Sequence, residues 1–319
     1  PVGLVVDMAH RSSLIAEQAA RRSAWQRREP ELVEGPHSIR HDAIAIPERP
    51  APVPKGPIER YTEVAAISSL GVVGATLGAT RDPRRAADLV FTGVPKAATL
   101  GREAFAAHLD AALSRHGVLV MDPAVLRRFD RVDTLVLDAR LIRTGRWSVD
   151  RVEPVGDGAD ETSVTARTRS MLDPMDPFVR RTQQAWTLEL WEGDVRAPRG
   201  MTTRGRRLGK GGRRVMGLWR GDQLSGLVAL AEDPAPLSAD LVAAARSEGL
   251  DVVLSGGNDA MAERLGDIAR WTATHIVEEI RTHQSAGHVV MFVSGRAHKA
   301  LRTADVGVGV ESPGRRAPL

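Results

Sequence analysis

The chain has 319 residues, of which 42% are hydrophobic and 26% are charged, so it is long enough to bury a substantial core. It contains no cysteine, which excludes disulfide bonds and thiolate metal sites. Its formal net charge of +4 suits an anionic partner such as a nucleotide, a nucleic acid or an anionic membrane surface, without selecting one of them.

The first 60 residues are predicted to form a basic helix followed by a proline-rich linker. Residues 12–28 are densely basic, and such a helix either lies against anionic lipid or presents a solvated face. The segment from Pro30 to Pro57 contains seven prolines, counting both ends, and each removes a backbone donor and fixes φ. Because the chain begins with Pro1, we expect it to be a piece of a longer protein.

Residues 61–120 are predicted to be a vestigial membrane hairpin with stalk helices. Residues 64–80 form an uncharged run at the short limit for crossing a bilayer, and their glycines and serines suit close helix packing. A second apolar stretch, 86–100, is interrupted by Lys96. An amphipathic helix is expected at 104–116 and a short strand at 117–120.

Residues 121–150 contain the strand around which the rest is organised. The apolar and β-branched run 134–137 predicts a buried strand that ends at Asp138. Ligands bind at the carboxyl ends of strands in open parallel α/β sheets, so this position suits chemistry. A cap or turn at Asp138 explains the same residue equally well.

Residues 151–214 have weak periodicity and predict an inserted, reduced cap domain that ends in a flexible Gly/Arg-rich loop, 204–214. The spacing around Lys210 does not fit a phosphate-binding loop. The loop also lacks interleaved aromatic residues, so no specific nucleic-acid partner is expected. No two histidines at ligand spacing lie on a predicted helix, so no metal site is predicted.

Strands and helices alternate through 215–311, which predicts a parallel α/β sheet, and 312–319 is a tail. The expected strands are 226–231, 251–254, 288–293 and 306–310, and the expected helices are 238–248, 260–265, 276–284 and 297–302. Glu232 and Asp233 either join Asp138 in an acidic pocket or cap the following helix.

Several motifs follow one another along residues 86–310: GVPKA at 93–97, GVLV at 117–120, the strand ending at Asp138, LVALAEDP at 227–234, VVLSGGN at 252–258 and ADVGVGV at 304–310. In this order they resemble the cytoplasmic part of P-type cation-transporting ATPases, in particular the large actinobacterial members called cation-transporting P-type ATPase I. The resemblance implies an α/β, haloacid-dehalogenase-like (Rossmann-type) domain at 121–150 and 215–311, split by a reduced nucleotide-domain-like insertion. It also implies a position at the cytoplasmic face of the cell membrane, with the remainder of a larger ATPase chain or its membrane domain as partner.

The family transfers phosphate from ATP to an aspartate with Mg²⁺, and Asp138 matches that aspartate. The resemblance also places Ser255, Gly256 and Asn258 in a phosphate-binding turn. However, the family's D-K-T-G-T sequence has become DARLI at 138–142, and T-G-D-N has become SGGN at 255–258. The acidic metal loop has become SGRAHK at 294–299, and Ile276 stands where a lysine is expected.

These losses predict a degenerate P-type ATPase module without catalytic turnover, with a structural or regulatory role in a larger membrane transporter. One alternative is an active cation-translocating ATPase that forms an aspartyl-phosphate at Asp138. Another is a basic module that binds nucleotide or anionic lipid, for which Arg140, Arg143, Arg296 and Lys299 would surround a phosphate. No resident cofactor is expected, and ATP and Mg²⁺ are expected only for the active alternative.

Overall fold

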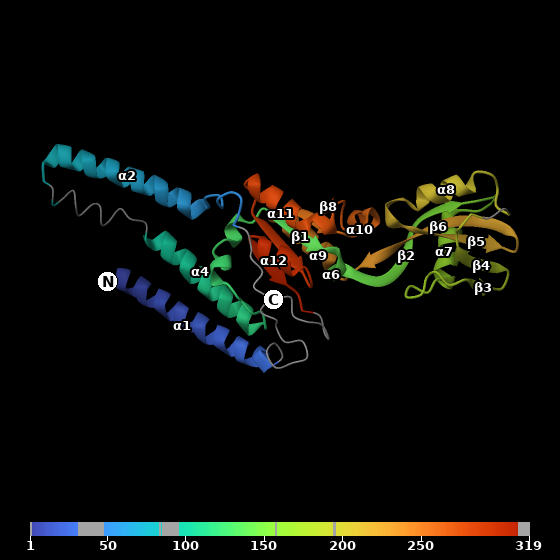
Figure 1. Cartoon of the computed structure of the whole chain (residues 1–319), viewed down its shortest axis with the longest axis horizontal. Coiled ribbons are helices and arrows are strands. Elements are labelled where there is room, and N and C mark those ends of the chain that lie inside the picture. The colour runs from blue at the N-terminus through green and yellow to red at the C-terminus, as the bar shows by residue number, and fades with distance from the viewer. Residues whose placement is uncertain are drawn as a thin grey trace. The chain divides into compact units, whose positions relative to one another are not determined.

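The computed structural model describes residues 2–30, 48–82, 84, 96–156, 158–193 and 196–311 (Figure 1). The segment 93–95, most of the proline-rich linker and the tail 312–319 therefore lie outside the described residues. The chain divides into two compact units. The first comprises Pro1–Thr134, Val277–Phe292 and Arg296–Leu319, and the second comprises Leu135–Ile276 and Val293–Gly295.

The N-terminal helices of the first unit are longer than the sequence predicts. They are α1 (Val2–Glu29), α2 (Pro57–Thr80), α4 (Lys96–Arg115), α5 (Pro123–Leu126) and the 3-10 turn η2 (Phe129–Arg131). Helix α1 packs along α4 (Figure 1), and small side chains such as Ala24, Ala107 and Ala111 are buried there. Small residues let two helix backbones approach closely.

Polar side chains are buried between α1 and α4. Asp110 of α4 is fully buried and is paired with Arg21 of α1, which also binds Glu17. Ser114 donates to Asp110 Oδ1 at 3.3 Å. Burial raises the pKa of Glu17, and its hydrogen bond with Asp110 raises the pKa further. A buried carboxylate is tolerated only when it is paired, so Arg21 ties the two helices together.

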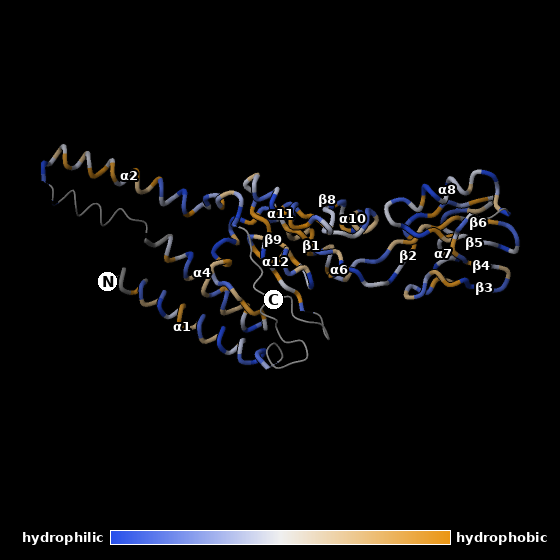
Figure 2. The backbone as a smooth tube through the Cα atoms, in the orientation of Figure 1, coloured by the Kyte–Doolittle hydropathy of each residue, from blue (hydrophilic) through white to orange (hydrophobic). Residues whose placement is uncertain are grey.

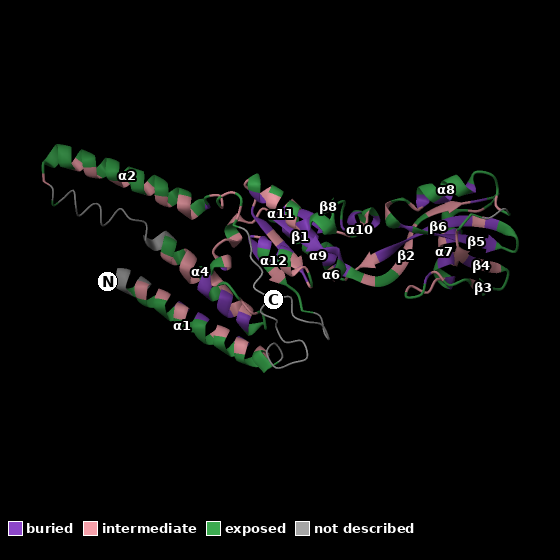
Figure 3. Cartoon of the chain, in the orientation of Figure 1, coloured by how far each residue is buried: buried purple, intermediate pink, exposed green. Residues whose placement is uncertain are grey.

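Helix α2 exposes its apolar residues. None of its residues is buried (Figure 3), and apolar positions recur along its length (Figure 2). It is the one helix in the described ranges that is long and apolar enough to cross a membrane. A membrane location for 64–80 stays a prediction, since length and composition alone support it.

The mixed α/β fold with a parallel sheet that the sequence predicts is confirmed. The sheet has the strand order β10-β9-β1-β7-β8, and β8 runs parallel to β7. Its strands are β1 (Thr134–Asp138), β7 (Asp251–Ser255), β8 (Ala269–Trp271), β9 (Val290–Ser294) and β10 (Val306–Gly309). The helices of this part of the chain are α6 (Ala139–Ile142), α9 (Ser238–Ser247), α10 (Asp259–Arg264), α11 (Ile276–Ser285) and α12 (His298–Thr303), with the 3-10 turn η4 (Ala273–His275).

The second unit also contains an antiparallel sheet of order β2-β6-β5-β4-β3. Its strands are β2 (Arg143–Pro154), β3 (Arg181–Gln183), β4 (Trp186–Leu190), β5 (Arg214–Arg220) and β6 (Gln223–Pro234), with helices α7 (Glu161–Met171) and α8 (Met201–Leu208). In β6, Val228 and Leu230 pack with α7, while Leu227 and Ala229 pack with α8. Burial on both faces explains the continuous apolar run in this strand. The sheet extends from Arg143 to Pro234, beyond the 151–214 expected for the insertion.

Three local expectations are wrong. The stretch 204–214 is not a loop, because Met201 and Leu208 anchor α8 in the core and β5 begins at Arg214. Residues 117–120 form no strand, since Gly117 turns out of α4 with φ +82°. Glu232 and Asp233 do not cap α9; they belong to β6, and α9 begins without a side-chain cap.

A network of ion pairs joins the antiparallel sheet to α10 within the second unit. The buried side chain of Arg213 donates to Asp150 Oδ2 at 2.6 Å and also pairs with Glu263. Arg264 donates to Asp150 Oδ1 at 3.2 Å and pairs with Asp233. These charges neutralise one another between the antiparallel sheet and α10.

We predict that Arg213→Ala lowers the free energy of unfolding by about 3 kcal/mol, because it removes the buried guanidinium that pairs with both Asp150 and Glu263. Urea unfolding at pH 7 measures this change. The matched control is Arg151→Ala, which also loses a partner of Glu263 but from a half-exposed side chain, and it should cost less than about 1 kcal/mol. Equal effects in the two variants would contradict a structural role for the network.

Candidate functional site

Strand β1 places Asp138 in a buried position at its carboxyl end. All five residues of β1 are buried, and the Asp138 side chain is 3% exposed. The chain then turns into the short helix α6, and Asp138 Oδ1 accepts a hydrogen bond from the Arg140 backbone N–H at 3.0 Å. Asp138 is therefore the N-cap of α6, and Oδ1 is the oxygen that accepts the capping hydrogen bond.

The Arg140 guanidinium binds both oxygens of the same carboxylate. Its Nε lies 3.0 Å from Asp138 Oδ1, and its Nη2 lies 2.9 Å from Oδ2. The Ser294 hydroxyl, at the end of β9, donates to Oδ2 at 2.6 Å. A two-point arginine–carboxylate contact is a strong charge-assisted interaction. Both oxygens of Asp138 are thus engaged by groups of the protein itself.

The contacts with Arg140 and Ser294 lower the pKa of Asp138. Burial by itself would raise the pKa of this carboxyl, but several favourable contacts outweigh burial and hold the pKa below its ordinary value of 3.8. The largest of these contacts is the hydrogen bond from the Arg140 side chain, followed by that from Ser294 and that from the Arg140 backbone. Asp138 is therefore ionised, and its charge is neutralised by Arg140.

The turn 255–258 packs beside the residue that follows Asp138. A Cβ added at Gly257 would come within 3.0 Å of the Ala139 Cβ, so these two segments touch. Gly256 has φ +74° and donates its N–H to Trp271 O at 2.9 Å. Asn258 caps α10 through Met261 N at 2.9 Å and donates to Gly212 O at 3.3 Å.

Ser255 is buried at the end of β7, beside this turn. The turn thus packs against Ala139, the residue that follows Asp138 in the sequence. Phosphate binding by Ser255, Gly256 and Asn258 stays a prediction, and the main-chain N–H of Gly256 and the Asn258 side chain already have partners inside the protein.

Arg143, Glu232 and Asp233, the other charged candidates in the second unit, have hydrogen-bond partners other than Asp138. Arg143 Nε donates to Glu232 Oε2 at 2.8 Å, and Glu232 also accepts from Gly145 N. Asp233 accepts from the Ser148 hydroxyl at 2.6 Å. Asp138, Glu232 and Asp233 do not form a group of acidic side chains that could hold a metal ion among the described residues, and each has an arginine or serine partner.

The groups around Asp138 do not fit a magnesium ion. Mg²⁺ requires several oxygen ligands in octahedral geometry, whereas a guanidinium spans both oxygens of this carboxylate. Among the residues that the structure describes, no three His, Cys, Asp or Glu side chains are grouped so that they could hold a metal ion.

The sequence predicts the position of Asp138 but not the partners that engage it. Arg140 stands where the family motif has its first threonine. An arginine two residues after a helix cap can reach back to the capping side chain, and this spacing is the signal that the sequence offers. Ser294 offers a weaker signal, namely its place directly after a predicted strand.

No family model matches the chain. The chain is 26% identical, over an alignment of 371 positions, to a probable cation-transporting ATPase I of Mycobacterium leprae, and the alignment covers 98% of this chain and 22% of that protein. It is 31% identical over 199 positions to the probable cation-transporting ATPase I of Mycobacterium tuberculosis, covering 48% of this chain and 12% of that protein. The chain therefore spans less than a quarter of the length of these curated relatives.

Similarity to solved structures is weak. One crystal structure of a zinc-transporting PIB-type ATPase superposes with a TM-score of 0.45 at 16% identity, over 91% of this chain and 52% of that chain. A second crystal structure of a zinc-transporting PIB-type ATPase gives a TM-score of 0.44 at 17% identity, over 80% of this chain and 50% of that chain. From the sequence similarity along nearly its whole length, this chain is a P-type ATPase-like protein.

Proposed function

We propose that this chain is a P-type ATPase-like module that does not turn over ATP. The observation that carries the proposal is the closed carboxylate of Asp138, which Arg140 and Ser294 engage at both oxygens. In-line attack on ATP requires a carboxylate oxygen that is free to approach the terminal phosphate. Here Oδ2 would first have to lose its charge-assisted contact with Arg140 and its hydrogen bond from Ser294.

The substitutions around Asp138 support the same conclusion. Phosphoryl transfer depends on cations that stabilise the charge spread over the transferred group. Ala139 stands where the family motif has its lysine, and Gly257 stands where the T-G-D-N turn has its aspartate. Arg140 supplies positive charge, but Asp138 itself neutralises that charge.

The role that fits such a module is structural or regulatory within a larger cation-transporting membrane protein at the cytoplasmic face of the membrane. Its relatives are several times longer than the region they share with this chain. The apolar and exposed α2 suits a place beside a bilayer or another helix. The rest of such an ATPase, or its membrane domain, is the partner we propose.

Labelling with ATP tests the proposed lack of turnover. With Mg²⁺ and ATP labelled at the γ-phosphate, wild type should incorporate no more acid-stable phosphate than Asp138→Asn, because the nucleophile is occupied. Acid quenching and gel autoradiography measure incorporation. Labelling of wild type that disappears in Asp138→Asn would establish the active alternative and overturn the proposal.

The contacts of Asp138 make the stability of the protein depend on pH. Because the pKa of Asp138 is lowered in the folded protein, its charge stabilises the fold above the ordinary value of 3.8, and this contribution is lost as pH falls through the folded pKa. Asp138→Asn should therefore be less stable than wild type by roughly 1–2 kcal/mol between pH 5 and 7. The difference should shrink below about pH 4.

Urea unfolding at pH 7, 5 and 3 measures this difference. Asp222→Asn is the matched control, because its carboxylate is 93% exposed and the substitution should leave stability unchanged at every pH. A stability gap between Asp138→Asn and wild type that widens toward low pH would show that burial of the charge dominates over its pairing with Arg140.

A further inference from the structure

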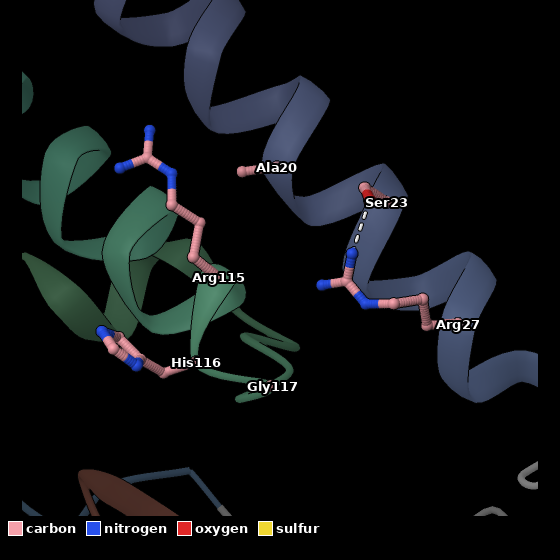
Figure 4. A pocket seen from close by; sticks show the side chains of 6 residues that line it. All are labelled: Ala20, Ser23, Arg27, Arg115, His116 and Gly117. Carbon is pink, nitrogen blue, oxygen red and sulfur yellow. Dashed lines mark hydrogen bonds between the residues drawn. The ribbon is translucent and has the colours of Figure 1, made fainter.

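A cleft of about 440 Å³ opens between the ends of α1 and α4, within the first unit (Figure 4). It is lined by Ala20, Ser23, Arg27, Arg115, His116 and Gly117. Three of these residues are basic and none is acidic. In Figure 4 the Arg27 side chain reaches along α1 toward Ser23, and Arg115 stands across the opening on α4.

Among the residues that the structure describes, no carboxylate pairs with the two arginines of this cleft. Arg27 donates to Ser23 Oγ at 2.7 Å and to Ser114 O at 3.2 Å, and both acceptors are neutral. Within the described ranges Arg115 makes no hydrogen bond and no ion pair. In contrast, Arg11 and Arg21 of the same helix α1 each bind an acidic side chain.

Stabilisation of the helix C-termini explains the presence of only one of the two arginines. Both α1 and α4 end here, and basic side chains stabilise the carbonyl groups at a helix C-terminus. Arg27 has this role toward Ser114 O, whereas Arg115 has no such contact within the described residues. A second guanidinium without an acceptor therefore remains beside the cleft, where it attracts an anion.

We propose that this cleft binds a phosphate-bearing anion. Two guanidinium groups from facing helices can donate to the oxygens of one phosphate, a geometry that arginine suits better than lysine. The phosphate comes either from a phospholipid headgroup or from free phosphate in solution.

A second cleft beside α1 favours a phospholipid headgroup as the source of the phosphate. This cleft of about 480 Å³ is lined by Gln18, Arg21, Arg22, Trp25, Leu119, Val120 and Met121. Tryptophan beside arginine and apolar side chains is typical of surfaces that contact a membrane interface. The first unit also carries α2, which is apolar and long enough to cross a bilayer.

Calorimetric titration of the full chain in a neutral detergent tests the proposal. The probes are sodium phosphate, dihexanoyl phosphatidylglycerol and, as the zwitterionic control, dihexanoyl phosphatidylcholine. Wild type should bind the phosphatidylglycerol, and Arg27→Gln/Arg115→Gln should weaken this binding about 20-fold, since each arginine near an anionic surface contributes a several-fold gain in affinity. Detergent keeps α2 from anchoring the protein independently of the cleft.

The control variant Arg11→Gln/Arg60→Gln removes the same charge outside the cleft and should bind within about twofold of wild type. Cleft-dependent binding of sodium phosphate alone supports the site and identifies free phosphate as the source. Equal losses in the two double variants, equal binding of both lipids, or no binding of any probe by wild type would each overturn the proposal. Far-ultraviolet circular dichroism confirms that the exposed substitutions leave the helices intact.

Discussion

The charge on Asp138 is the constraint on which the candidate site depends. A carboxylate buried at the end of a central strand must be neutralised, and in this chain the neutralising group is Arg140, only two residues further along. The same carboxylate caps α6 and brings in the Ser294 hydroxyl from β9. Because these contacts satisfy both oxygens, the requirement of folding and the requirement of phosphoryl transfer compete for one side chain.

The strands and helices around the site were largely predictable because their apolar patterns are strong. The run 134–137 and the end of β7 near Ser255 lie where the sequence predicts them, and the fold brings the turn at Gly257 against Ala139. Periodicity shows which face of an element is buried. It does not show which acceptor a long side chain reaches, so the contact between Arg140 and Asp138 could not be predicted.

The stretch 204–214 illustrates a different limit. Its glycines and arginines are typical of a loop, yet Met201 and Leu208 bury one face of α8, and Gly205 lies so close to Trp191 that no Cβ would fit. Arg213 is buried among carboxylates that come from distant parts of the sequence. Composition describes the average behaviour of such a segment, whereas tertiary contacts decide its structure.

Arg140 and Ser294 bind the Asp138 carboxylate, and we expect these contacts to keep it from binding metal. The most direct measurement is the carboxyl carbon-13 chemical shift of Asp138, assigned by comparison with Asp138→Asn and followed during titration with Mg²⁺. We expect the chemical shift to be that of an ionised carboxylate to below pH 3.8 and not to move with millimolar Mg²⁺. A shift that saturates with Mg²⁺ in wild type would show that the carboxylate exchanges Arg140 for metal and would contradict the account.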